Sequence, residues 1–215
     1  MEARIETLVV GPFGVNCFLV FGERNSVIVI DPGADAERIA DCLTSARATV
    51  ACYLITHGHV DHISALAEME ALFPAPIGIH PLESKWAFSR ANHMLPFYGP
   101  PRKPSAIERE LQGNQIWTDA GLRYKVLFTP GHSPGAVCFY FESLGVVFTG
   151  DTLFAGSVGR TDLPGGDART LAASLKHLKC LPPDTRVFPG HGPATTIAAE
   201  KATNYFLRGC KLDET

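Results

Sequence analysis

The chain has 215 residues, of which 46% are hydrophobic and 19% charged, with 20 glycines and 16 prolines. This composition is that of an ordinary globular protein with enough apolar residues to build a packed core. A net charge of -3 provides no basic surface for a phosphate backbone, which argues against a nucleic-acid partner and favours small-molecule chemistry.

The cysteines and the apolar runs indicate where such a protein works. Six cysteines are spread along the chain without a C-x-x-C pair, which predicts reduced and mostly buried thiols. No apolar run approaches the length of a membrane span, and the run near the start is too short for a signal peptide. We therefore expect a cytoplasmic protein without a membrane partner. Because no linker interrupts the sequence, we expect residues 1–215 to form one domain.

Five short apolar segments each lead to an acidic residue or a histidine. Their β-branched and aromatic residues, followed at once by a turn residue, predict strands that deliver a polar side chain at their ends. Apolar residues three or four apart predict helices between some of these strands. In chain order the predicted strands cover residues 26–31, 50–59, 124–132, 146–151 and 185–191, and the predicted helices cover residues 35–46, 62–73 and 168–181.

Strands and helices therefore interleave, although some strands are also expected to pair directly. Residues 136–150 predict two strands joined by a turn at 143–145. This mixture favours an α/β fold with helix-covered sheets over a purely parallel wound sheet. Residues 74–115 are rich in proline and aromatic residues and form the least regular part, which we expect to lie over the site as a lid.

The densest chemical signal is THGHVDH at residues 56–62, directly after an apolar run. Residues two apart on an extended chain point the same way, so His57 and His59 can present their imidazoles to one metal ion. Asp61 and His62 lie where the following helix is expected to begin, so the chain turns and directs both toward a second point. One short loop can thus contribute to two metal sites.

Three further candidate ligands come singly from other strand ends: His132, Asp151 and His191. Open zinc sites use about three protein ligands each, so two sites that share a bridging carboxylate need about seven donors. We assign His57, His59 and His132 to one ion and Asp61, His62 and His191 to the other, with Asp151 as the bridge. Two divalent ions are expected, zinc first, with iron and manganese as alternatives.

Other interpretations of these residues are weaker. His80, His93 and His177 do not cluster with other donors and are expected to be structural. The G-x-S-x-G pattern at residues 131–135 would need a helix after Ser133 to form a nucleophile elbow, whereas a strand-like run follows. Asp31 suits two roles equally, as a carboxylate that orients a ligating imidazole or as a turn residue before Pro32.

With these residues in hand, the chain resembles the metallo-β-lactamase superfamily, and within it the short glyoxalase II-like hydrolases. The resemblance covers nearly the whole chain and rests, in order, on GVNCFLV, VIDPG, THGHVDH, TPGHSPGAVCF, FTGDTLFAGSVGRTDLPGGD and FPGHGP. It implies an α/β fold of four layers, αββα, in which two mixed β-sheets are flanked by helices and the metals lie at strand ends. It also implies hydrolysis of a thioester, typically S-2-hydroxyacylglutathione.

Two departures from the glyoxalase II pattern bear on substrate binding. Those enzymes add a C-terminal helical domain that helps to hold glutathione, whereas only 24 residues follow His191 and we expect no such domain. They also carry a lysine and a nearby tyrosine where this chain has Arg160 and Asp162. Arg160 can bind a substrate carboxylate in bidentate fashion, or it can pair with Asp162 within the loop.

The mechanism that the resemblance implies uses a hydroxide that bridges the two ions and attacks the thioester carbonyl. Asp61 would orient this hydroxide and pass a proton, while Asp151 would hold the two ions together. Three alternatives remain: a persulfide dioxygenase with a single iron held by two His and one Asp, a lactonase, and a metal-binding module without activity. Persulfide dioxygenases share the GRTD stretch at residues 159–162. The complete second set of ligands favours hydrolysis.

Overall fold

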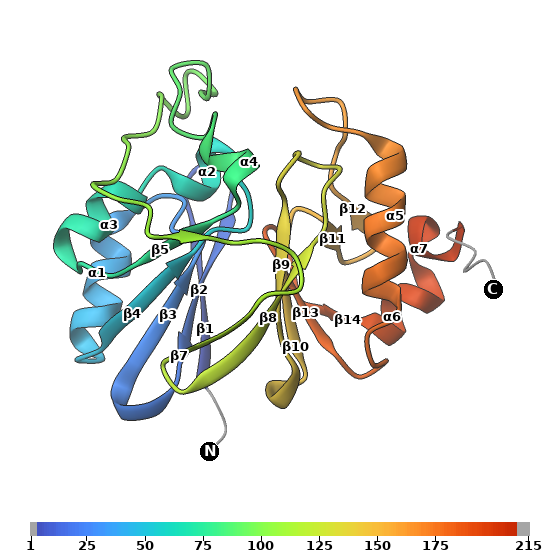
Figure 1. Cartoon of the computed structure of the whole chain (residues 1–215), viewed down its shortest axis with the longest axis horizontal. Coiled ribbons are helices and arrows are strands. Elements are labelled where there is room, and N and C mark those ends of the chain that lie inside the picture. The colour runs from blue at the N-terminus through green and yellow to red at the C-terminus, as the bar shows by residue number, and fades with distance from the viewer. Residues whose placement is uncertain (1–3, 210–215) are drawn as a thin grey trace.

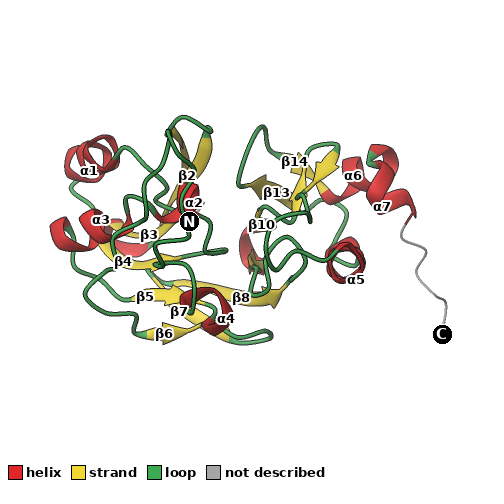
Figure 2. Cartoon of the chain, turned by 90° about the horizontal axis from the view of Figure 1, so that it is seen from above, coloured by secondary structure: helices red, strands yellow, loops and turns green. Residues whose placement is uncertain are grey.

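In the computed structural model, which describes residues 4–209, two six-stranded sheets face each other and helices cover the outer side of each (Figure 1). The view from above shows the layers separately, with different helices outside each sheet (Figure 2). The predicted αββα arrangement of two mixed sheets is therefore confirmed. The first sheet carries α1 (Ala36–Ser45) and α3 (Leu66–Leu72), and the second carries α5 (Ala168–Lys179), α6 (Ile197–Thr203) and α7 (Tyr205–Gly209).

The first sheet begins with antiparallel neighbours and continues with parallel ones. Its strands follow chain order: β1 (Arg4–Val10), β2 (Val15–Phe21), β3 (Ser26–Ile30), β4 (Thr49–Leu54), β5 (Ile77–Ile79) and β6 (Arg109–Glu110). Pairing is antiparallel from β1 to β3, with a short 3-10 turn, η1 (Glu23–Asn25), before β3. The parallel pairs β3 with β4 and β4 with β5 bring the ends of these three strands to one edge of the sheet.

The second sheet is antiparallel except for one pair. Its order is β14 (Thr195–Thr196), β13 (Arg186–Pro189), β10 (Val146–Gly150), β9 (Val137–Phe141), β8 (Leu122–Phe128) and β7 (Ile116–Asp119). The antiparallel pair β9 and β10 is joined through η2 (Glu142–Leu144), which confirms the predicted turn. Because β10 and β13 are parallel, both end at the same edge. A separate hairpin of β11 (Leu153–Phe154) and β12 (Ser157–Val158) follows β10.

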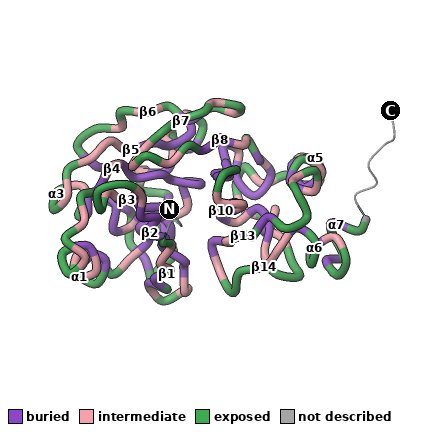
Figure 3. Tube along the Cα trace, turned by 90° about the horizontal axis from the view of Figure 1, so that it is seen from below, coloured by how far each residue is buried: buried purple, intermediate pink, exposed green. Residues whose placement is uncertain are grey.

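Alternation along the strands explains why the sheets stack. In β3, Ile28 and Ile30 belong to the core between the sheets, whereas Val27 and Val29 pack under the helices of the first sheet. In β10, Phe148 faces the inter-sheet core while Val147 faces α5. Both faces of β3 and of β10 are buried, as expected of strands covered on both sides. Figure 3 shows buried residues gathered in the strands and exposed ones along the outer helices.

The predicted helix over residues 62–73 is wrong in its continuity, because it is divided into α2 (Val60–Ile63) and α3. In a continuous helix the amide of Ala65 would bond to the carbonyl of Asp61, four residues earlier. It donates instead to the carbonyl of Pro32, in the loop after β3, at 3.1 Å. A tertiary contact with a distant loop therefore interrupts the helix.

The segment predicted to be irregular, residues 74–115, contains β5, a single-turn helix α4 (Pro81–Ser84) and β6. The sequence prediction missed these two short strands because neither is long enough to show an alternating pattern.

The cysteine prediction holds where the structure describes the residue. Cys17, Cys42, Cys52, Cys138 and Cys180 are free thiols, of which Cys17, Cys52 and Cys138 are buried. Cys210 lies outside the described residues. Within residues 4–209, every helix is too short or too polar to cross a membrane.

Candidate metal centre

The seven candidate ligands come from the segments that directly follow β4, β8, β10 and β13, and their donor atoms lie close together. The loop after β4 carries four of them. His59 has an extended backbone, with φ -62° and ψ 144°, and α2 begins at the next residue. His57 and His59 therefore precede the helix while Asp61 and His62 lie within it, as the sequence predicts.

One group of three imidazoles forms on one side of this centre. The ligating nitrogens of His57, His59 and His132 all lie within 4.8 Å of one another. His132 comes from the loop after β8 in the second sheet, and its Nε2 lies 2.9 Å from His59 Nδ1. The two sheets therefore contribute jointly to this group, which we call the first set.

A second group contains one carboxylate and two imidazoles. Donor atoms of Asp61, His62 and His191 also lie within 4.8 Å of one another, and we call this group the second set. Asp151, at the end of β10, lies between the two sets. Its Oδ1 is 3.4 Å from His62 Nε2, and its Oδ2 is 3.6 Å from both His132 Nε2 and His191 Nε2. This is the position that a carboxylate shared by two ions would take.

Unpartnered polar atoms show that these residues fit metal ions. His57 Nε2, His62 Nε2 and Asp151 Oδ1 are buried without a hydrogen-bond partner among the described residues. Burying polar atoms in this state costs free energy, so their retention indicates that something else binds them. Imidazole nitrogen and carboxylate oxygen suit zinc, iron and manganese alike. The site therefore fits two divalent cations.

The other ring nitrogen of four of these histidines is held by a fixed partner. His62 Nδ1 is 2.9 Å from Asp31 Oδ2, and His57 Nδ1 is 3.0 Å from Thr56 Oγ1. Backbone carbonyls hold the other two, with the carbonyl oxygen of Arg160 2.8 Å from His132 Nδ1 and that of Phe13 3.1 Å from His191 Nδ1. Such contacts fix the tautomer and the ring orientation of a metal ligand.

Asp31 lies with the orienting groups even though it is close enough to be a ligand. Its donor atom falls within a further 4.8 Å group with His57 and His62. Both of its oxygens are already engaged, because Oδ1 accepts from the Thr56 amide at 2.8 Å and Oδ2 accepts from the Thr56 hydroxyl at 2.5 Å. Of its two predicted roles, this geometry favours orienting an imidazole.

The two sets differ electrostatically. Burial lowers the pKa of His57 well below its usual value, and burial with the neighbouring His132 lowers the pKa of His59 to about 4. Burial also opposes protonation of His62, but the carboxylates of Asp151 and Asp61 outweigh it and raise the pKa of His62 well above its usual value. Without a cation, the imidazoles of the first set are therefore neutral and offer lone pairs to a metal. In the second set, a protonated His62 forms a buried charge pair with the neighbouring carboxylates.

The open side of the site lies toward His191, whose side chain is 27% exposed, whereas His57 and His62 are fully buried. Phe154 packs beside His191 and Trp86 packs beside His59. Arg160 is exposed, and its guanidinium bonds in bidentate fashion to Asp162 at 2.7 and 2.6 Å. Its side chain therefore already has a carboxylate partner, while its backbone supports His132.

Sequence reasoning missed several residues that hold the ligand loops. Asn16 is buried, and its side-chain amide donates to the carbonyls of Pro189 and Gly192 on either side of His191. It lies in GVNCFLV, one of the motifs that carried the family resemblance. Glu83, from α4, accepts hydrogen bonds from both loops that carry the imidazoles of the first set. No local pattern marks Glu83, because its partners are distant in sequence.

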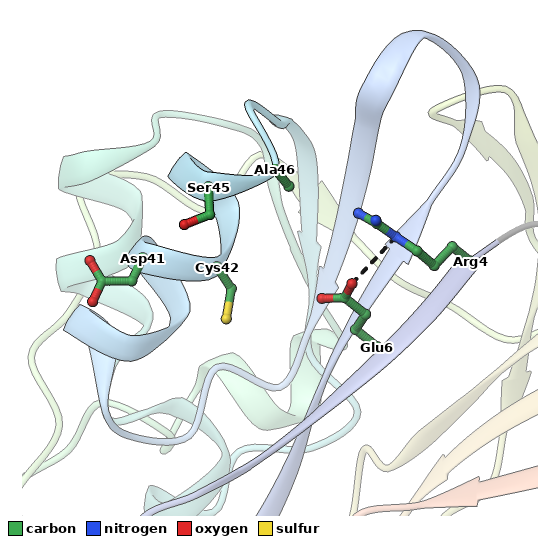
Figure 4. Close-up of a pocket in the computed structure, with 6 residues that line it drawn as sticks. All are labelled: Arg4, Glu6, Asp41, Cys42, Ser45 and Ala46. Carbon is green, nitrogen blue, oxygen red and sulfur yellow. Dashed lines mark ion pairs between the residues drawn. The ribbon is translucent and has the colours of Figure 1, made fainter.

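The remaining histidines and a hollow at the surface of the first sheet lie outside this centre. His80 caps α4 by accepting from the Leu82 amide, and its ring stacks on Phe128, which confirms a structural role. His93 and His177 belong to neither set. A hollow between β1 and α1 is shown in Figure 4, where Arg4 pairs with Glu6. It is lined by Arg4, Glu6, Asp41, Cys42, Ser45 and Ala46, none of which is a candidate ligand.

Comparison with known proteins identifies relatives along nearly the whole chain. The family described as the metallo-beta-lactamase superfamily matches residues 10–191, which include all seven candidate ligands. The hydroxyacylglutathione hydrolase GloC of Haemophilus influenzae is 34% identical over 95% of this chain and 98% of its own. The crystal structure of the BLEG-1 B3 metallo-beta-lactamase superposes with a TM-score of 0.90 at 35% identity, over 96% of this chain and 100% of the other. TTHA1623, in a di-iron-bound form, gives 0.86 at 38% identity over 94% and 99%.

Proposed function

The chain belongs to the metallo-β-lactamase superfamily and is a metallo-hydrolase, and from that premise we propose that it cleaves a thioester, with S-2-hydroxyacylglutathione as the first candidate substrate. A relative with a third of its residues identical over nearly full length is named for this reaction. In this proposal the substrate is a small molecule, and residues 1–215 act as one domain.

The observation that carries the proposal is the placement of Asp151 between two complete sets of donors. We assign His57, His59 and His132 to one ion, Asp61, His62 and His191 to the other, and Asp151 to both. Each set supplies three protein ligands and leaves room for water or substrate, which distinguishes catalytic metal sites from closed structural ones. Zinc is the first candidate, and the di-iron form of TTHA1623 makes iron the main alternative.

Two ions bound there would supply a hydroxide nucleophile near neutral pH and would polarise the substrate carbonyl. The protein supplies the geometry. Asp61 is mostly buried, and its Oδ2 lies 3.4 Å from His191 Nε2 at the open side, where it can orient a nucleophile and accept its proton. Asp31 holds His62 in one tautomer and orientation, so this ligand needs no rearrangement when substrate binds.

The completeness of the second set favours hydrolysis over persulfide oxidation. A single-iron dioxygenase needs two His and one Asp as metal ligands. It would therefore leave several of these side chains without a metal ion to bind. Among the described residues, His62 Nε2 is fully buried without a hydrogen-bond partner, and its charged neighbour there is Asp151 Oδ1 at 3.4 Å, an arrangement that would be costly if only one ion bound. A lactonase would use the same groups, because an ester ring opens by the same attack.

The test combines metal analysis with substrate turnover. We expect two divalent ions per chain and hydrolysis of S-D-lactoylglutathione, with no oxygen consumption in the presence of glutathione persulfide. A homoserine lactone and a β-lactam serve as competing substrates, the latter because a relative is named as a B3 metallo-β-lactamase. One iron per chain with oxygen uptake and no thioesterase activity would contradict the proposal. A preference for either competing substrate by ten-fold or more in kcat/KM, about 1.4 kcal/mol, would replace the substrate class.

A further inference from the structure

Glu83 is a buried carboxylate outside the donor sets, and each of its oxygens accepts a hydrogen bond from a different ligand loop. Its side chain is fully buried on α4. Oε2 accepts from the amide of Gly58 at 2.7 Å, and Oε1 accepts from the amide of Gly135 at 2.5 Å. Gly58 lies between His57 and His59, and Gly135 lies three residues after His132. The two loops that form the first set are therefore joined through one side chain.

The pairing requires a group with two acceptors. An ionised carboxylate has acceptors on both oxygens and no donor, so it matches two converging amide N–H groups. A glutamine would present an NH2 group to one of these amides, and a donor cannot accept the bond. Burial raises the pKa of Glu83, while the bonds from Gly58 and Gly135 oppose this rise. Both amides are thus satisfied by a side chain that has no contact with solvent.

The same segment also holds the other face of the Gly58 peptide. Asn92 is buried, and its Nδ2 donates to the Gly58 carbonyl at 2.8 Å and to the Ala87 carbonyl at 2.5 Å. A Cβ atom built on Gly58 would lie 2.9 Å from Ala87 Cβ and 3.0 Å from Glu83 Oε2. The peptide between His57 and His59 is therefore fixed on its N–H side, on its carbonyl side and by close packing.

We propose that Glu83, supported by Asn92, is a positioning residue that fixes the spacing of the first set of ligands across the two sheets. The residues of the second set receive their support elsewhere, from Asp31, Asn16 and the Phe13 carbonyl. Loss of the Glu83 bonds is therefore expected to weaken one metal site and not the other. Glu83 and Asn92 both lie in residues 74–115, the segment expected to form a lid, so in this proposal part of that segment organises the ligand loops.

The experiment measures zinc affinity one site at a time. The inference rests on the proposed assignment of ligands, so His191→Ala is used to retain only the first site and His59→Ala to retain only the second. Each metal-free protein is titrated with zinc against a chromophoric chelator. Glu83→Gln should weaken binding about 10–100-fold in the His191→Ala background, the usual effect of losing an outer partner, and less than about 3-fold in the His59→Ala background.

Glu200 provides a matched control. It is also a buried glutamate, and it accepts from the Gly156 amide at 2.9 Å and from the side chains of Thr195 and Asn204, away from the first set. Glu200→Gln should leave zinc affinity of the first site within about 3-fold, because it removes a comparable buried acceptor without touching these loops. Equal weakening by both variants would show a general loss of stability and would overturn the positioning role.

Two further measurements test the proposal even if the Glu83→Gln variant does not fold. Asn92→Ala removes the other hold on Gly58 and should show the same selectivity for the first site. In the unmodified metal-free protein, the amide protons of Gly58 and Gly135 should exchange slowly, and fast exchange of both would refute the proposal. If neither single-site background binds zinc, the ligand assignment fails. If both bind and Glu83→Gln weakens them equally or not at all, only the role of Glu83 fails.

Discussion

The two halves of the molecule contribute to the centre in different ways. The first sheet supplies four candidate ligands from one loop of six residues, 57–62, whereas the second supplies three from three separate strand ends. The short loop serves two sites because its backbone changes from extended at His59 to helical at Val60. The second sheet serves two sites because β8, β10 and β13 all run in the same direction and therefore end at one edge. Each set therefore depends on contact between the halves, and neither half can form a site alone.

Asp151→Ala is expected to have the largest effect, because this carboxylate lies between the two sets, near His132 on one side and His62 and His191 on the other. Without it, each set loses its shared carboxylate and the separation of the ions is no longer fixed. We expect kcat/KM to fall by about 10³-fold or more, with the loss of metal from both sites. Thermal unfolding should remain cooperative, which separates this outcome from loss of the fold. Full activity with two bound ions would refute the bridging role.

Asp31→Asn should have a smaller effect that falls mainly on the second set, because Asp31 contacts His62 directly and reaches His57 indirectly, through the Thr56 hydroxyl. Asn also tolerates the positive φ of 50° at this position, so backbone strain should not change. The amide has only one acceptor oxygen for the three donors now bound by the carboxylate. Zinc affinity of the second site should fall about 10–100-fold, as measured in the His59→Ala background.

Asp35→Asn is the control for this change. Asp35 also has a positive φ, 53°, and accepts a backbone hydrogen bond, from Gly11 at 3.0 Å, but it is not in contact with a candidate ligand in the described structure. In the His59→Ala background, Asp35→Asn should leave the zinc affinity of the second site within about 3-fold of that without the change. If Asp31→Asn behaves like Asp35→Asn, the Asp31 carboxylate is a turn residue and not an orienting group.

Arg160→Ala should have the smallest effect, and it tests the side chain apart from the backbone. The carbonyl that supports His132 is retained, so metal content should not change. If the guanidinium binds a substrate carboxylate, KM for S-D-lactoylglutathione should rise about ten-fold with little change in kcat. Asp162→Ala should then leave KM unchanged or lower it, because the guanidinium becomes free. Equal KM values in both variants and the parent would show that the Arg160–Asp162 pair only stabilises its loop and does not bind substrate.

Much of this architecture follows from local sequence patterns. The strands that carry ligands are apolar and end on turn residues, so β3, β4, β8, β10 and β13 were each predicted. The same rule could not find β5 or β6, which are too short to show alternation. It also could not predict that the Ala65 amide would donate to the Pro32 carbonyl, a distant contact that divides the helix.

The candidate ligands were predictable, whereas most of their supports were not. For His and Asp, the residue type and the spacing along the chain indicate metal binding. The carbonyls of Phe13 and Arg160 carry no residue identity, because any residue supplies the same acceptor. Glu83 is 25 residues from Gly58 and 52 from Gly135, so only the folded chain shows that it joins them.

The order of the ligands along the chain has a consequence for biosynthesis. All three imidazoles of the first set have been translated once His132 is made, whereas the second set must wait for His191, after β13. At about 5–20 residues per second, that delay is about 3–12 seconds. During this time a nascent chain holds His62 and Asp61 without their last partner, so any cation acquired early can be matched only by the first set. The second set is the last part of the centre that synthesis can complete.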